Sequence, residues 1–327
     1  MTLSDRRGLD ASAREILANT PNQKRLVLLW AAAAAALSLL TGLMSYVLDN
    51  GIAGTGGLSG IGLRSALTTA QHVLSTFTTV FLPFWTLGYT HATLRMARRQ
   101  GVRDASLLEG FRRFGPGLRL MLLQGLLYGG IFTLCTYAAI LLLAATPLAN
   151  SAYAVLDPLA QQMAADPNWL PDEATAAALT KAMLPLAICG AAIAAVVLVP
   201  LMYRLRLASL RLVDDPRCGA LQAMGTSLHL TRGNAFKLFR LDLHFWWFWL
   251  LEAVILAITY GDTLLPKLGI SLPVSPDVAF WAFYVVALII QVIAYTALHN
   301  RISVTYALAY NSLLPKENGQ LTTDNCP

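Results

Sequence analysis

Hydrophobic residues gather into six long segments of the chain, separated by more polar ones. Each segment is long enough for an α-helix of about 20 residues to cross the roughly 30 Å hydrocarbon core of a bilayer. We therefore predict an all-α fold, a polytopic transmembrane helical bundle with six spans. The predicted spans are residues 26–48, 66–87, 118–142, 182–203, 241–260 and 278–298.

These spans divide the chain into three parts. Residues 1–25 form a charged, amphipathic cytoplasmic leader, and because the span after it is too long for a cleaved signal peptide, we expect that span to be retained. Residues 26–313 form the transmembrane domain, with an external loop at residues 146–181 that fits both a lid and a surface for a partner. Residues 314–327 are predicted to be a disordered cytoplasmic tail.

The distribution of positive charge predicts the orientation of the chain. Of the 24 lysine and arginine residues, 21 lie in segments on one side of the six-span layout, and only Arg64, Lys181 and Lys267 lie on the other. Cytoplasmic segments of membrane proteins carry an excess of these residues. We therefore expect a multi-pass protein with both termini in the cytoplasm.

A short amphipathic stretch precedes each of the three predicted hairpins. The apolar positions of one helical face are Leu9, Ala13, Ile16 and Leu17 in the first stretch, Leu107, Leu108, Phe111 and Phe114 in the second, and Leu221, Met224, Leu228 and Leu230 in the third. The second and fourth spans also end alike, in Ala-Thr-Leu-Arg at residues 92–95 and Ala-Ser-Leu-Arg at residues 208–211. The pattern fits three repeats of an interfacial helix followed by a hairpin. It equally fits the general accumulation of basic amphipathic segments at a cytoplasmic surface.

Composition favours a membrane protein over a soluble enzyme. Hydrophobic residues make up 56% of the 327 residues and charged residues only 13%, against roughly 25% charged residues in ordinary soluble domains. The net charge of +6 follows from the basic cytoplasmic segments. Because the sequence has no basic patch of the kind that a nucleic-acid interface needs, we expect no nucleic-acid partner.

Signatures of catalysis and of metal binding are missing from the sequence. The four cysteines are scattered, and the five histidines do not pair at the spacing of metal ligands. No P-loop, zinc-protease or nucleophile-elbow motif is present. We therefore expect a protein that is not an enzyme and that holds no metal or cofactor.

Polar residues within the predicted spans are candidates for a functional site. Glu252 lies in the fifth span with no other charge within nine residues, so it must be protonated, hydrogen-bonded or in contact with a cavity. Gln291 in the sixth span is a candidate partner, and the pair fits a structural hydrogen bond and also a proton or substrate site. In the second span, His72 and Thr79 belong to a polar stripe that fits helix packing and also the wall of an aqueous path.

The start of the fifth span and the second amphipathic stretch supply candidates for a site that binds lipid head groups or a partner protein. The aromatic run at residues 245–249 is typical of a membrane interface, and basic residues attract anionic head groups. We expect Asp242 to pair locally with Arg240 or Arg301. The candidate residues for this site are Asp242, Arg240, Arg112, Arg113, Trp246 and Trp247.

Small residues and prolines affect the packing of the third and fourth spans. Gly125 and Gly129 in the third span, and a run of glycine and alanine at residues 190–195 in the fourth, let helix backbones approach closely. This fits tight packing within the bundle and also a homo-oligomer. Pro185 and Pro200 predict kinks in the fourth span.

Three passages resemble a family of bacterial integral-membrane proteins of unknown function. The most specific passage runs from Gly233-Asn234 to Phe245-Trp246 and is similar to the family motif "GN.w.LF.LDLSF.GW". Residues 6–17 are similar to the basic opening helix of the family, and residues 108–115 are similar to its second cytoplasmic motif. The resemblance implies six helices and a location in the plasma (inner) membrane, and it implies no chemistry.

Two functions fit these observations. The first is a non-enzymatic membrane protein that organises lipids or partner proteins at the cytoplasmic face. Its expected partners are the lipid bilayer, anionic head groups, another membrane protein or a second copy of the chain. The second function is that of a small-solute or ion transporter that uses Glu252 and Gln291.

Overall fold

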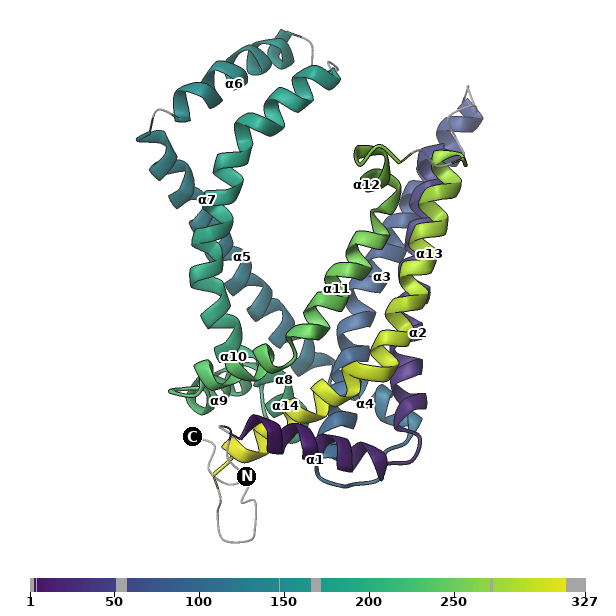
Figure 1. The fold of residues 1–327 in the computed structure, drawn as a ribbon, viewed down its shortest axis with the longest axis vertical. Helices are drawn as coiled ribbons and strands as arrows, with labels where there is room; N and C mark the ends of the chain where they lie inside the picture. Colours follow the sequence, from purple (N-terminus) through teal and green to yellow (C-terminus); the bar gives the residue numbers. More distant parts are fainter. Residues whose placement is uncertain are drawn as a thin grey trace. The chain divides into compact units, whose positions relative to one another are not determined.

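The computed structural model describes residue 3 and residues 5–50, 58–146, 148–165, 172–270 and 273–315. Every regular element in these ranges is a helix (Figure 1), which confirms the predicted all-α class. The chain divides into two units: unit 1 comprises Met1–Leu118 and Leu207–Pro327, and unit 2 comprises Arg119–Arg206. Most of the predicted disordered tail, from residue 316 onward, lies outside the described residues.

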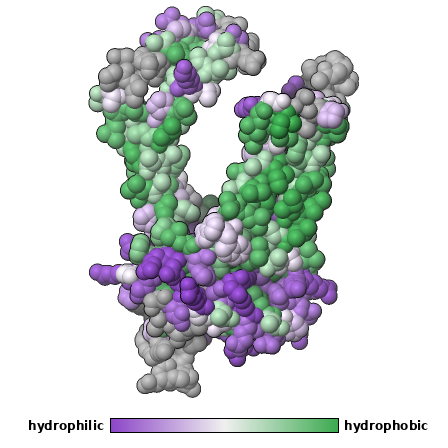
Figure 2. All heavy atoms as spheres, viewed as in Figure 1, coloured by the Kyte–Doolittle hydropathy of each residue, from purple (hydrophilic) through white to green (hydrophobic). Residues whose placement is uncertain are grey.

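Four long helices form the apolar part of unit 1. They are α2 (Gln23–Asn50), α3 (Leu58–Ala97), α11 (Trp246–Thr259) and α13 (Pro276–Ala294), and the short α12 (Gly261–Lys267) follows α11. Both α3 and α13 pack against α2, and α11 packs against α13 (Figure 1). Hydrophobic side chains cover much of their surface (Figure 2), which suits helices that face lipid.

Shorter helices form the polar end of unit 1, where hydrophilic side chains gather in Figure 2. This end consists of α1 (Arg6–Ala18), the 3-10 helix η1 (Asp104–Leu108), α4 (Glu109–Arg112), α8 (Ala208–Asp214), α9 (Ala220–Leu230), α10 (Ala235–His244) and α14 (Asn300–Leu313). A π-helical turn, η2 (Tyr295–His299), joins α13 to α14. The last of these helices, α14, packs against both α1 and α3.

The three predicted amphipathic stretches have different outcomes. The first stretch forms the helix α1, in which Leu9, Ala13 and Ile16 are buried. The second stretch is not one regular helix, because it is split between η1 and α4 and leaves Leu108 exposed. In the third stretch Leu221 is 72% exposed, because α9 buries a neighbouring face rich in small residues.

Glycines set the contact between α3 and the second stretch. A Cβ atom added at Gly88 of α3 would lie 1.8 Å from the carbonyl oxygen of Leu107. A Cβ atom added at Gly110 of α4 would lie 1.9 Å from the carbonyl oxygen of Phe84. The two backbones therefore touch at a distance that no larger residue permits.

Among the described residues, four helices are long and apolar enough to cross a membrane, and a fifth if one bent pair counts as a span. The four are Gln23–Leu48, Phe114–Ala144, Ala174–Asp214 and Pro276–Leu313, which overlap the predicted first, third, fourth and sixth spans. The second predicted span lies within α3. This helix is not one of the four, because its polar stripe lowers its mean hydropathy. The fifth predicted span is not one straight helix, because α10 and α11 meet at Phe245 with a bend of 63°.

Unit 2 contains three helices. They are α5 (Phe114–Ala144), whose first turn belongs to unit 1, α6 (Leu148–Ala165) and α7 (Glu173–Leu205). The predicted external loop at residues 146–181 therefore holds α6 and the start of α7, and these two helices pack together. Asp172 caps α7 by accepting a hydrogen bond from the Thr175 N–H at 3.0 Å. The two predicted kink prolines, Pro185 and Pro200, lie inside α7.

Candidate functional site

A buried carboxylate on α1 organises the polar end of unit 1. Asp10 is 3% exposed, and its two oxygens accept hydrogen bonds from Nε and Nη2 of Arg301 on α14. Arg14 Nη2 also donates to Oδ2 of Asp10 at 2.9 Å. His244 Nε2, at the end of α10, lies 3.5 Å from the same oxygen. The carboxylate of Asp10 therefore connects α1, α10 and α14.

The partners of Asp10 keep it charged. Burial by itself would raise the pKa of its carboxyl group, but the hydrogen bonds and positive charges of Arg301 and Arg14 hold the pKa below its usual value. Asp10 is therefore ionised at neutral pH. Its charge is matched by the two guanidinium groups, which is the arrangement that a buried carboxylate needs.

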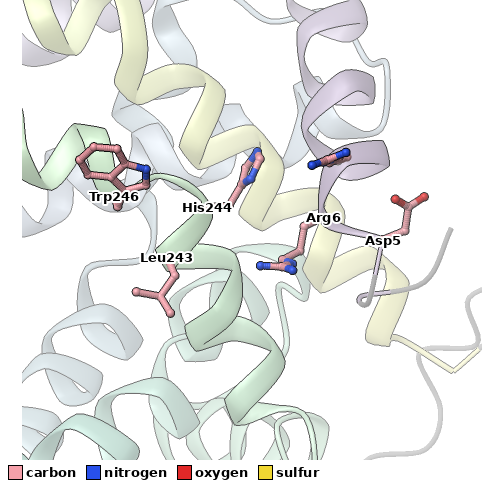
Figure 3. Close-up of a pocket in the computed structure, with 6 residues that line it drawn as sticks. Asp5, Arg6, Leu243, His244 and Trp246 are labelled. Carbon is pink, nitrogen blue, oxygen red and sulfur yellow. The ribbon is translucent and has the colours of Figure 1, made fainter.

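A pocket of about 500 Å³ lies next to this network, where the start of α1 faces the junction of α10 and α11 (Figure 3). Arg6 and Asp5 lie on the α1 side, and Arg6 Nη1 donates a hydrogen bond to the Arg240 carbonyl at 3.2 Å. Asp5 caps α1 by accepting a hydrogen bond from the Gly8 N–H at 2.9 Å. The pocket is lined by Asp5, Arg6, Arg7, Leu243, His244 and Trp246.

The pocket combines positive charge with exposed apolar side chains. Arg6 and Arg7 offer planar donor groups that match phosphate and carboxylate oxygens. Leu243 is 51% exposed and Trp246 is 61% exposed. Such a site suits an amphiphile with an anionic group rather than a metal ion. Within the ranges that the structure describes, no group of three His, Cys, Asp or Glu side chains is arranged to hold a metal.

The residues predicted for a lipid site do not form one site, and each has a different role in the structure. Among them, Trp246 lines the pocket, and Arg240 contributes its backbone carbonyl to Arg6. Arg112 pairs with Glu109 on the exposed surface of α4 at 2.8 Å. Arg113 Nη1 donates to the backbone carbonyls of residues 212 and 215 at 3.2 and 2.8 Å, so it holds the end of α8. Trp247 is half-buried.

Asp242 has a partner that the sequence did not predict. It lies on the buried face of α10, together with Leu238 and Leu241. Its Oδ1 accepts a hydrogen bond from the hydroxyl group of Tyr306 on α14. Arg301, one of the two predicted partners, makes its bidentate pair with Asp10. Asp242 therefore ties α10 to α14.

A second polar cluster joins α3, α8 and α14. Arg98 makes a bidentate pair with Asp214, in which Nη2 lies 2.9 Å from Oδ2, and its Nε donates to Asn311 Oδ1 at 3.3 Å. The Tyr310 hydroxyl donates to the same Asp214 Oδ2 at 2.9 Å. This cluster was not predicted from the sequence. One feature of the sequence points to it. The second and fourth predicted spans end in similar four-residue passages, and Arg98 and Asp214 each lie three residues after one of these passages.

The predicted intramembrane candidates lie on separate helices. Gln291 Nε2 on α13 donates a hydrogen bond to the Tyr295 hydroxyl at 3.4 Å. The same hydroxyl group interacts with the Glu252 carboxyl group on α11. Tyr295, which the sequence analysis missed, therefore links the two predicted partners. Glu252 Oε1 is buried and has no hydrogen-bond partner among the described residues. His72 and Thr79 are exposed on α3, and Thr79 Oγ1 donates to a carbonyl of its own helix at 2.8 Å.

An aromatic cluster next to η2 was also missed. The Trp30 ring of α2 stacks on Tyr89 of α3 and on His299 of η2, with ring centroids 4.6 and 5.0 Å apart. The Tyr89 hydroxyl donates to Asn300 Oδ1 at 3.1 Å. No sequence pattern marks this cluster, because its members lie far apart in the chain.

Apolar helices of membrane-spanning length, joined to a polar end with an arginine-lined pocket, define a helical membrane protein. The chain belongs to the family described as "Protein of unknown function (DUF975)", whose model matches residues 1–317. No curated protein and no solved structure matches the chain. The family match covers every residue of the pocket and of the two polar clusters.

Proposed function

We propose that the protein is a non-enzymatic integral protein of the bacterial inner membrane that organises anionic lipids at the cytoplasmic face. The observation that carries the proposal is the pocket between α1 and the junction of α10 and α11. Arg6 and Arg7 are suited to the phosphate of a lipid, and the exposed Leu243 and Trp246 are suited to its acyl chains. In this proposal the chain crosses the membrane six times, with both termini in the cytoplasm.

Other apolar side chains at the polar end support an interfacial position. Leu108, Leu221 and Phe236 are 56%, 72% and 68% exposed. They belong to short helices that also carry exposed basic residues, such as Lys237 and Arg240 on α10. Helices with this composition lie in the head-group region, with apolar side chains in the acyl boundary and basic ones near anionic lipids.

Removing the two arginines of the pocket tests the lipid function. In the double variant Arg6→Gln, Arg7→Gln we expect binding of phosphatidylglycerol to weaken roughly tenfold, since each basic residue near an anionic lipid surface contributes about 1 kcal/mol. Binding of phosphatidylcholine should hardly change. The measurement is a titration of the detergent-solubilised full chain with each lipid, read as lipid retained per protein by native mass spectrometry.

The matched control removes two exposed charges elsewhere at the polar end. The variant Arg232→Gln, Lys237→Gln loses the same net charge but leaves the pocket intact. It should weaken phosphatidylglycerol binding less than the pocket variant does, because its two charges attract anionic lipid but line no part of the pocket. Equal losses in the two double variants would mean that only overall charge attracts the lipid, and the pocket would then have no role as a binding site.

Transport is the second candidate function, and one observation favours it. Glu252 Oε1 is buried in the apolar part of unit 1 without a hydrogen-bond partner among the described residues, and its neighbour Tyr295 connects it to Gln291. A carboxyl group in such a position is typical of a proton or solute pathway. Neither Glu252 nor Gln291 lines the cavities of about 500 and 290 Å³.

A proton-flux assay tests the transport candidate. Full-length protein in liposomes that contain a pH-sensitive dye should dissipate an imposed pH gradient faster than empty liposomes do. The variant Glu252→Gln should return the rate to that of empty liposomes, because the amide keeps the shape of the side chain and cannot carry the proton. Glu109→Gln, which removes a partly exposed carboxylate on α4 far along the chain from Glu252, is the control. A parent protein that conducts no faster than empty liposomes would exclude proton transport.

A further inference from the structure

Another cavity, of about 240 Å³, lies where the end of α3 meets α8. Its lining residues are His91, Leu94, Arg95, Arg98, Gln100, Val213 and Asp214. The end of α3 is shaped by a Schellman turn, in which the Gln100 N–H donates to the Arg95 carbonyl at 2.9 Å and Arg99 takes a left-handed conformation with φ of 56°. This turn brings Gln100 back beside the last turn of α3.

The acidic wall of this cavity is already neutralised. Both oxygens of Asp214 accept hydrogen bonds from the guanidinium group of Arg98, and Oδ2 also accepts one from the Tyr310 hydroxyl at 2.9 Å. Arg98 in turn is held by Asn311. The charges of Arg98 and Asp214 therefore cancel within the wall, and the positive charge that remains on the lining residues is that of Arg95.

Two nitrogen atoms of other lining residues have no partner among the described residues. His91 Nδ1 and Arg95 Nε are both buried, and neither has a hydrogen-bond partner among the described residues. They lie one helical turn apart on α3, so they face the same side of that helix. A buried polar group left without a partner destabilises the fold. The two residues that carry these atoms both line the cavity, which favours a ligand with acceptor atoms there.

We propose that this cavity binds a phosphate-type oxyanion, held by the guanidinium group of Arg95 and the imidazole of His91. An oxyanion supplies acceptor atoms only, which matches the charge of Arg95 and its unpaired Nε. The ligand is the phosphate group of a soluble compound or of a lipid with a phosphomonoester head group, because both carry the same chemistry. The site is separate from the pocket at the start of α1 and does not depend on the lipid function proposed for it.

The surroundings of His91 agree with a role as a neutral donor. Burial lowers the pKa of its imidazole, although the nearby carboxylate of Glu109 opposes this effect. Arg95 and Arg113 lower the pKa further, while Asp214 raises it. His91 is therefore neutral at pH 7, and a neutral imidazole donates one hydrogen bond without adding a charge.

Phosphate binding by the full chain in detergent tests this proposal. Two probes separate the sources: inorganic phosphate, and vesicles of phosphatidylcholine with about 10% phosphatidic acid. We expect saturable binding of one or both probes by isothermal titration calorimetry. Arg95→Gln should weaken that binding roughly tenfold or more, since a hydrogen bond to a charged group contributes about 1.5–3 kcal/mol. His91→Gln should weaken it less, because His91 contributes no charge.

Controls distinguish a lost site from a lost fold. Arg232→Gln removes an exposed arginine outside the cavity and should leave phosphate binding unchanged. Thermal unfolding without phosphate should give similar midpoints for the parent protein and Arg95→Gln, whereas added phosphate should raise the midpoint of the parent protein more. The proposal is overturned if neither probe binds, or if Arg95→Gln binds as tightly as the parent protein.

Discussion

Alanine at Gly88 or at Gly110 should destabilise unit 1 by roughly 3 kcal/mol or more, at the upper end of the cost of overpacking. The added Cβ atom would lie 1.8 Å from the Leu107 carbonyl oxygen in the first variant and 1.9 Å from the Phe84 carbonyl oxygen in the second. Both obstacles are backbone atoms, so no change of side-chain rotamer removes the clash. The η1 and α4 segment must therefore move away from α3. The measurement is the thermal unfolding midpoint of the detergent-solubilised protein, together with the yield of monodisperse protein.

Gly225 provides the matched control for these two variants. It also lies inside a helix of unit 1, α9, but a Cβ atom there would meet nothing within 4 Å. Gly225→Ala should be neutral or stabilising by about 0.5–1 kcal/mol, because alanine loses less backbone entropy in a helix. If Gly88→Ala unfolds at the same temperature as Gly225→Ala, the close contact between α3 and η1 does not exist in the protein.

Asp10→Asn should cost about 3 kcal/mol of folding free energy or more, as expected when one partner of a buried ion pair is removed. Asparagine has nearly the same shape, but it leaves Arg301, which is 23% exposed in its side chain, without a countercharge. It also removes the anion beside Arg14 and His244. Glu15→Gln on the same helix is the control, because the Glu15 pair with Arg99 is exposed on both sides and should contribute less than 1 kcal/mol.

The lowered pKa of Asp10 gives this variant a distinctive pH dependence. The pKa of Asp10 is lower in the folded state than its value of 3.8 in the unfolded chain. Its charge therefore stabilises the fold fully at a pH above 3.8, and this contribution is lost as the pH falls through the folded-state pKa. Chemical unfolding of the parent protein from about pH 7 to about pH 3 should therefore show a loss of stability that is missing from Asp10→Asn. Parallel curves for the two proteins would mean that Asp10 does not form the buried pair.

The sequence predicted the elements that depend on local periodicity. The apolar face of α1 was predicted because Leu9, Ala13 and Ile16 follow the helical repeat, and these residues are buried. Four predicted spans overlap helices of spanning length because long apolar runs need no tertiary information. The bend at Phe245 was not predicted, since the residues on both sides of it are equally apolar.

The contacts of the site depend on chain segments that the sequence cannot bring together. Asp242 binds Tyr306, which is 64 residues away, and Arg98 binds Asp214, which is 116 residues away. The glycine contact between α3 and α4 could not be predicted either. The sequence shows only that glycine is a weak helix former, and it does not show which backbone packs against it. The pocket at the start of α1 was not predicted, and Trp246 is the one of its lining residues that the sequence marked as a candidate.

The position of α14 has a consequence for how the protein is made. Its residues Arg301, Tyr306 and Tyr310 bind acidic side chains on α1, α10 and α8. This helix leaves the ribosome after all the helices to which it binds, and its contact with Asp10 spans 291 residues. The earlier helices can enter the bilayer during translation, but the polar end closes only after α14 has been synthesised. A nascent chain stalled before residue 300 would therefore leave Asp10 with Arg14 and Asp214 with Arg98 but without their partners on α14.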